Sequence, residues 1–153
     1  MYKRQQEDTQ ITINTILDVA TEQLITLGYE KMSYTTLSEQ TGISRTGISH
    51  HFAKKVDIPC ALQGRLLKLM VEKLDLSKNE TVFIASWQKA LEDGQFLAIW
   101  RLAFQMTIGR HHQPYVYELT SQVESLVAYK LSQPCYKTIE WLIGLTLMKI
   151  GQA

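Results

Sequence analysis

The sequence has few of the residues that build disulfide-rich or membrane-spanning proteins. Its two cysteines, Cys60 and Cys135, lie far apart without CxxC spacing, which predicts free thiols in a reducing compartment. The longest uncharged apolar run, residues 141–148, is too short to cross a bilayer. A secretory signal requires an apolar segment after its basic residues, and no such segment follows Lys3 and Arg4. Together these absences predict a cytoplasmic protein.

Catalytic and cofactor motifs are also missing. The chain contains no GxSxG, no glycine-rich phosphate loop and no HExxH. The pairs His50–His51 and His111–His112 invite a metal hypothesis, but adjacent helical residues point about 100° apart. No thiolate or carboxylate stands at ligand spacing beside them. We therefore expect no enzyme activity, no cofactor and no metal, and we interpret His111–His112 as a helix end or solvated loop.

What the sequence does contain is a series of helical patterns. Of its 153 residues, 45% are hydrophobic and 20% charged, which suits a globular chain with a sizeable core. Apolar residues recur at intervals of three and four, with no alternation typical of strands. The prediction is an all-α fold of about eight helices. The net charge of +1 does not exclude DNA binding, because the basic surface that binds DNA is local.

The first helix is predicted from an apolar stripe that ends at Gly28, a residue suited to a helix end. The stripe consists of Ile13, Ile16, Leu17, Ala20, Leu24 and Leu27. The polar residues 1–8 are expected to be frayed. We expect this helix to pack across the two short helices that follow it.

Residues 33–55 predict those two short helices and a tight turn. Ser33 and Ser44 are suitable N-caps, and Gly42 can take the left-handed conformation at the end of the first helix. Ile48 and Phe52 are spaced to point to the core. A helix-turn-helix of this kind places its second helix in the DNA major groove.

This stretch resembles the helix-turn-helix of the TetR family of bacterial transcriptional regulators. The residues in register are Gly42, Ile43, Ser44, Ile48, His51, Phe52 and Lys55, and the likeness covers about the first 58 residues. Ser38 and Ser49 depart from the alanine and tyrosine that are usual there. The resemblance implies a homodimeric regulator, with a repressor as the expected type, that binds a palindromic operator on double-stranded DNA.

The predicted DNA-binding residues have three roles. Base edges are assigned to Ser44, Arg45, Thr46 and Gly47, with Arg45 as the best candidate for guanine. Phosphates are assigned to Thr35, Thr36, His51, Lys54 and Lys55. Ser49 and His50 suit either role. In this interpretation the DNA-binding domain spans residues 1–56.

Residues 57–153 are predicted to form a helical dimerisation and ligand-binding domain, beginning with one helix from Asp57 to about Leu74. A group of aromatic and polar residues lies on two of its helices: Phe83, Trp87, Phe96, Trp100, Arg101, Phe104 and Gln105. An ordinary core is one interpretation of this group. The other is a pocket for a small apolar or aromatic effector, which the resemblance also implies. In the family, effector binding shifts the fourth helix and changes the separation of the two recognition helices.

The last two predicted helices have wide apolar faces. The first face carries Leu119, Val123 and Leu126, and the second carries Ile139, Leu142 and Ile143. A pair from each subunit would form a four-helix bundle across a two-fold axis, as the resemblance implies. Alternatively, both helices close the core of one subunit. A protein of the same fold that has lost its effector and acts through protein–protein interaction is the alternative function.

Overall fold

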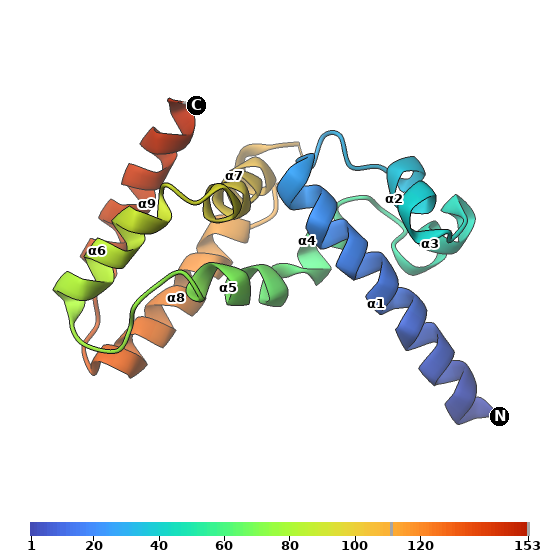
Figure 1. Cartoon of the computed structure of the whole chain (residues 1–153), viewed down its shortest axis with the longest axis horizontal. Coiled ribbons are helices and arrows are strands. Elements are labelled where there is room, and N and C mark those ends of the chain that lie inside the picture. The colour runs from blue at the N-terminus through green and yellow to red at the C-terminus, as the bar shows by residue number, and fades with distance from the viewer. Residues whose placement is uncertain (111, 153) are drawn as a thin grey trace. The chain divides into compact units, whose positions relative to one another are not determined.

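The computed structural model describes residues 1–110 and 112–152, and its regular elements are all helices (Figure 1). Nine are found in that part of the chain: α1 (Tyr2–Thr26), α2 (Tyr34–Thr41), α3 (Arg45–His51), α4 (Asp57–Ala61), α5 (Gln63–Val71), α6 (Glu80–Ala90), α7 (Gly94–Ile108), α8 (Tyr115–Leu131) and α9 (Tyr136–Gly151). The predicted all-α class is confirmed. The chain divides into two compact units, Met1–Leu62 and Gln63–Ala153.

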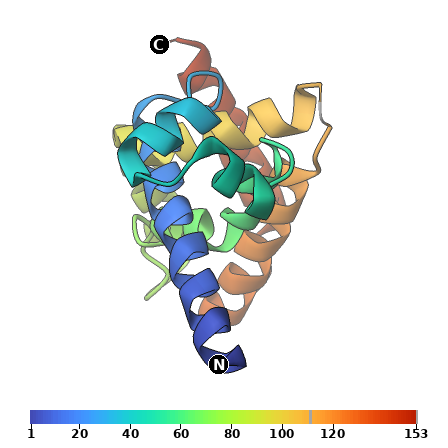
Figure 2. The same ribbon diagram turned by 90° about the vertical axis from the view of Figure 1, so that its right-hand side faces the viewer.

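In the first unit, α1 runs as one unbroken helix to the N-terminus (Figure 2). Its buried residues, Ile16, Leu17, Ala20, Gln23 and Leu24, follow the predicted stripe. The helix ends where the amides of Leu27 and Gly28 both donate to the Gln23 carbonyl, and Gly28 takes a φ of +83°. The prediction of a frayed segment 1–8 is wrong. That segment lacks glycine and proline and is rich in Gln, Glu, Lys and Arg, which favour helix.

The segment after the helix-turn-helix forms two helices where one was predicted. At the break, the Leu62 amide donates to the carbonyls of both Ile58 and Pro59 at 3.1 Å. Gly64 lowers the helix propensity next to this point. The second helix, α5, ends at Val71 and so stops short of the predicted end near Leu74. The division between the two compact units coincides with this break.

In the second unit, α7 packs against α5, α8 and α9, while α6 packs against α9. Four aromatic residues lie at the core of this unit. The ring centroid of Trp87 is 5.9 Å from that of Phe83, 5.4 Å from that of Phe96 and 5.6 Å from that of Trp100. The contacts with Phe83 and Phe96 are edge-to-face, and the rings of Trp87 and Trp100 are tilted by 37°. Aromatic pairs of this kind add to the stabilisation that burial supplies.

A buried hydrogen-bond chain joins α6 to α9. The indole Nε1 of Trp87 donates to the Thr146 hydroxyl at 2.9 Å, and that hydroxyl donates to the Leu142 carbonyl at 2.8 Å. Trp87 and Thr146 are both fully buried. Buried polar groups cost little only when they are paired, so the chain fixes the register of α6 on α9.

The apolar faces of α8 and α9 lie differently from the predicted dimer faces. Four of the six residues of those faces are fully buried within the chain itself, so they belong to its own core: Leu119, Val123, Ile139 and Leu142. The other two, Leu126 and Ile143, are half-buried. The exposed side of α9 carries Trp141, Gly144, Leu147 and Met148. These four positions follow the three- and four-residue spacing of a single helix face.

Candidate nucleic-acid interface

Helix α2 is fixed at both ends by its own sequence. The Ser33 side chain accepts from the Thr36 amide at 3.1 Å, and the Thr36 hydroxyl accepts from the Ser33 amide at 2.9 Å. This reciprocal pair is a capping box. At the other end Gly42 takes a φ of +73°, and its amide donates to the Ser38 carbonyl at 2.9 Å. A side chain at Gly42 would be strained in this left-handed conformation.

Helix α3 begins with a cap that depends on a nearby glycine. The Ser44 hydroxyl accepts from the Gly47 amide at 3.0 Å. A Cβ atom on Gly47 would lie 3.1 Å from the Ile43 side chain and 3.2 Å from the Ser44 hydroxyl. Both distances are tighter than ordinary packing, so the glycine leaves room for the cap and for Ile43. Ile48 is the buried residue that anchors α3 to the unit.

A polar network from α1 holds α2 in place. Gln23 is only 4% exposed. Its Nε2 donates to the Thr36 carbonyl at 3.0 Å and to Gln40 Oε1 at 2.8 Å, and its Oε1 accepts from the Thr36 hydroxyl at 2.7 Å. Sequence reasoning missed Gln23. The signal was a polar residue inside the apolar stripe of α1, between Ala20 and Leu24.

The segment after α3 is held by two further contacts. The Tyr34 hydroxyl donates to the Phe52 carbonyl at 2.6 Å. Lys55 Nζ lies 4.4 Å from the centre of the Tyr29 ring and donates to the Glu30 carbonyl at 3.4 Å. A cation over an aromatic face is attracted by the ring. Burial lowers the pKa of Lys55, and the nearby Glu30 carboxylate opposes this.

The predicted DNA-binding residues separate into an exposed set and a half-buried set. The exposed set consists of Thr35, Ser44, Arg45, Thr46, His50 and Lys54. The half-buried set consists of Thr36, Gly47, Ser49, His51 and Lys55. The Ser49 hydroxyl donates to the Thr46 carbonyl at 3.1 Å, and the Thr36 hydroxyl belongs to the Gln23 network. These two hydroxyls and the Lys55 ammonium are therefore already engaged within the unit.

The predicted effector residues lie mostly in the core. Phe83, Trp87, Phe96 and Trp100 are fully buried, and they pack on one another. Phe104 and Gln105 are half-buried, and Arg101 is exposed. Arg101 therefore reaches the surface instead of facing the core. The indole Nε1 of Trp100 is buried and has no hydrogen-bond partner among the described residues. A ligand site at this group remains a prediction.

The remaining sequence hypotheses concern metals, thiols and membranes. His111 lies outside the described residues, and within residues 1–110 and 112–152 no group of three or more metal-ligand side chains occurs. Cys60 and Cys135 form no disulfide within the described residues. Among the helices described, none combines the length and apolar character needed to cross a bilayer.

The capped pair α2–α3, with Gly42 between the helices and Arg45 exposed, defines a helix-turn-helix DNA-binding module. Residues 16–58 match the family described as bacterial regulatory proteins, tetR family. Residues 63–150, more than half of the chain, match the tetracycline repressor LuxT C-terminal domain. The chain belongs to the tetR family and is a DNA-binding transcriptional regulator. Both matches are to regulator families, which are not enzymes. No curated protein sequence matches the chain.

Proposed function

We propose that this protein is a repressor that binds a palindromic operator as a homodimer. The observation that supports the proposal best is the start of α3. There Ser44 caps the helix, Gly47 has no side chain, and Arg45 and Thr46 are exposed. Residues at the N-terminal end of a recognition helix contact base edges in the major groove. Arg45 is the guanine ligand in this proposal, because a guanidinium matches the two guanine acceptors.

Phosphate contacts are assigned to side chains around α3. Lys54 is exposed, and Thr35 is exposed at the start of α2. We rank Lys54 above Lys55 as a phosphate ligand, because the Lys55 ammonium already lies on Tyr29 and Glu30. A phosphate contact by Lys55 would have to replace those interactions. His51 keeps its assignment to a phosphate, and Ser49 and His50 keep both candidate roles.

The dimer is assigned to the exposed side of the last two helices. Trp141 and Met148 are 52% and 67% exposed, and both lie on the α9 face that also carries Gly144 and Leu147. Large exposed apolar side chains gathered on one face mark interaction sites. A second copy of the same chain fits this face, because α8 and α9 of two copies make a four-helix bundle across a two-fold axis.

The experiment that tests this proposal is selection of binding sites from a random pool of DNA duplexes. We expect an inverted repeat whose half-sites lie about 34–36 Å apart, or a multiple of that, because a two-fold dimer presents two recognition helices. Binding should weaken steeply as salt rises, since phosphate contacts release counterions. Recovery of no enriched sequence at moderate salt would contradict the proposal, and recovery of a single half-site would contradict the dimer.

Arg45→Ala and Lys54→Ala are expected to fail in different ways. Loss of the base contact should cost about 1–3 kcal/mol of operator affinity and relax the sequence preference at one position. Loss of the phosphate contact should weaken binding to all sequences alike and lower the salt slope by about one. Fluorescence anisotropy on operator and scrambled duplexes over a range of salt concentrations measures both effects. Lys68→Ala, an exposed lysine on α5, is the control. Identical profiles for the first two variants would refute these roles.

Release of the repressor from DNA by a small molecule is part of the proposal. It is supported by a groove of about 830 Å³ in the second unit, lined by residues of α5, α6, α8 and the α5–α6 connection. The alternative, a regulator without an effector, predicts that occupying this groove leaves operator affinity unchanged.

A further inference from the structure

The groove is lined by apolar side chains from three helices and the connection between α5 and α6. Its apolar lining comes from Val71, Leu74, Leu76, Val82, Ala85 and Leu126. On α6 the lining residues Val82, Ala85, Ser86 and Lys89 are spaced along one face of the helix. At 1.5 Å per residue, Val82 and Lys89 are about 10 Å apart along the helix axis. An unbranched chain of roughly eight to ten carbons spans that distance.

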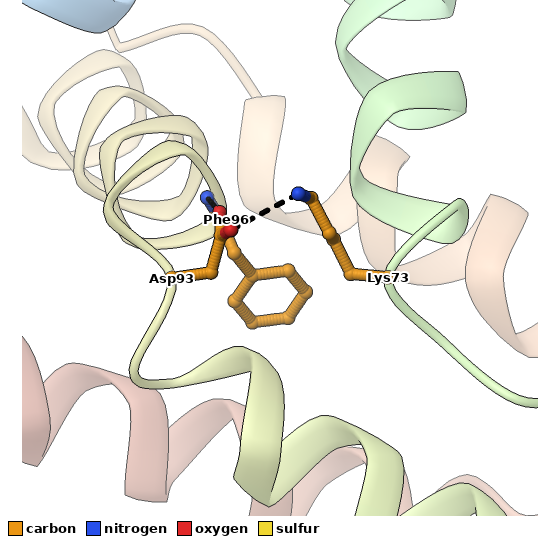
Figure 3. Close-up of polar contacts among 3 residues, drawn as sticks. All are labelled: Lys73, Asp93 and Phe96. Atoms are coloured by element: carbon orange, nitrogen blue, oxygen red, sulfur yellow. Dashed lines mark hydrogen bonds and ion pairs between the residues drawn. The ribbon is translucent and has the colours of Figure 1, made fainter.

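Hydrogen bonds fix the walls of the groove. Lys73 Nζ reaches from the end of α5 to the Asp93 carboxylate at 3.0 Å, and Asp93 also accepts from the Phe96 amide at 2.9 Å (Figure 3). The Asp75 amide donates to the Ser86 hydroxyl at 2.9 Å, which ties the α5–α6 connection to α6. The groove is therefore bounded by segments that are tied to one another.

Two of the five charged residues on the groove have polar partners within the described residues, and two lysines are among the other three. The charged lining residues are Glu72, Lys73, Asp75, Lys89 and Lys130. Lys73 is paired with Asp93, and the Asp75 carboxylate accepts from the hydroxyl and the amide of Ser77 at 2.6 and 2.9 Å. The two Ser77 hydrogen bonds lower the pKa of Asp75, and the hydrogen bond from the Phe96 amide, followed by that from Lys73, lowers the pKa of Asp93. Within the described residues, Lys89 and Lys130 make no ion pair. Glu72 is the remaining carboxylate on the groove, and its single negative charge offsets only one of the two positive charges.

We propose that this groove binds an amphipathic organic anion, with its apolar chain along Val82, Ala85 and Leu126 and its carboxylate held by Lys89 and Lys130. The apolar lining matches the hydrocarbon chain of the ligand, and the two lysines without ion pairs match a negatively charged head group. The site differs from the aromatic group around Trp87, whose side chains fill the core. The inference rests on the proposed function, because it names the effector of the same regulator.

The groove lies where a ligand can bias the connection to the DNA-binding unit. Its wall includes the last residue of α5, and α5 starts immediately after Leu62, the last residue of the first unit. A ligand that joins the end of α5 to α6 and α8 favours one position of α5 over others. Coupling of this kind is reciprocal: the anion in the groove changes the affinity for operator DNA by the same factor as DNA changes the affinity for the anion, typically 5–150-fold.

The test is calorimetric titration of the full chain with decanoate, decanol and decyltrimethylammonium, all kept below micelle formation. We expect decanoate to bind about tenfold or more tightly than decanol, and the cation to bind least. The double variant Lys89→Gln/Lys130→Gln should bring decanoate down to the affinity of decanol and leave decanol unchanged. Lys137→Gln, an exposed lysine on α9, is the matched control and should change neither.

Ala85→Trp places a large side chain in the groove and should abolish binding of both decanoate and decanol, with thermal melting confirming that the variant folds. Equal binding of acid and alcohol, or decanoate binding that survives Ala85→Trp, would overturn the proposal. Operator affinity without ligand is measured in parallel. A protein that binds its operator but not decanoate refutes the groove and leaves the DNA-binding function standing. Decanoate binding that leaves operator affinity unchanged refutes the effector role.

Discussion

Replacement of Trp87 by alanine is expected to cost the second unit about 3–5 kcal/mol of unfolding free energy. Trp87 is fully buried and contacts the rings of Phe83, Phe96 and Trp100. Its removal leaves a large cavity and takes away the Trp87 indole donor from the Thr146 hydroxyl, which keeps its hydrogen bond to the Leu142 carbonyl. The cavity and the lost hydrogen bond both add to the loss of stability. Urea denaturation followed by circular dichroism gives the change in free energy, and the transition midpoint should fall clearly.

Two control variants separate the parts of this effect. Trp87→Phe keeps a ring but removes the donor to Thr146, and it should cost less than the alanine variant, about 1–3 kcal/mol. Tyr129→Ala removes an aromatic side chain that is 79% exposed and should change stability by no more than about 0.5 kcal/mol. If Trp87→Ala unfolds at the same urea concentration as Tyr129→Ala, the aromatic group is not the core of this unit.

Gly144→Leu is expected to break the proposed homodimer while leaving the single chain folded. Glycine inside a helix costs about 1 kcal/mol relative to alanine, and a Cβ on Gly144 meets no atom of its own chain within 4 Å. Nothing within the subunit therefore requires glycine at this position. On the exposed face with Trp141 and Met148, it allows the helix of a second copy to approach closely. A leucine there should cost about 2–6 kcal/mol of dimerisation, because the two-fold axis places the substitution in the interface twice.

Sedimentation equilibrium over a range of protein concentrations measures this loss, and operator affinity should fall with it. The matched control is Gly64→Leu. Gly64 is also an exposed helical glycine with open space around its Cβ position, but it belongs to α5 and not to the exposed face of α9. A Gly144→Leu protein that remains dimeric would place the interface elsewhere.

The parts of the fold that the sequence predicted well are those set by local chemistry. The caps at Ser33 and Ser44 and the left-handed turn at Gly42 depend on residues within four positions of each other, so a single stretch contains the whole signal. The break at Leu62 carried no such signal, because Pro59 suits a helix start and Gly64 only weakens one.

Side-chain partners distant in sequence were the part that could not be predicted. Gln23 reaches Thr36 and Gln40 from another helix, and Lys55 reaches back to Tyr29 and Glu30. The apolar faces of α8 and α9 posed the same problem. Both sides of these helices carry large apolar residues, so periodicity could not tell the core side from the exposed side. The prediction that Leu119 and Ile139 face a second subunit was wrong for that reason.

Gly47 has a consequence for how regulators of this kind acquire new operators. Because a Cβ atom there would lie 3.1 Å from the Ile43 side chain and 3.2 Å from the Ser44 hydroxyl, a side chain at the third residue of α3 requires these neighbours to shift by a few tenths of an ångström. Arg45, Thr46 and His50 are exposed and carry no such requirement. Among descendants that diverge in the sites they bind, we expect these three residues to change more often than the glycine, because a substitution at Gly47 also requires the start of α3 to repack.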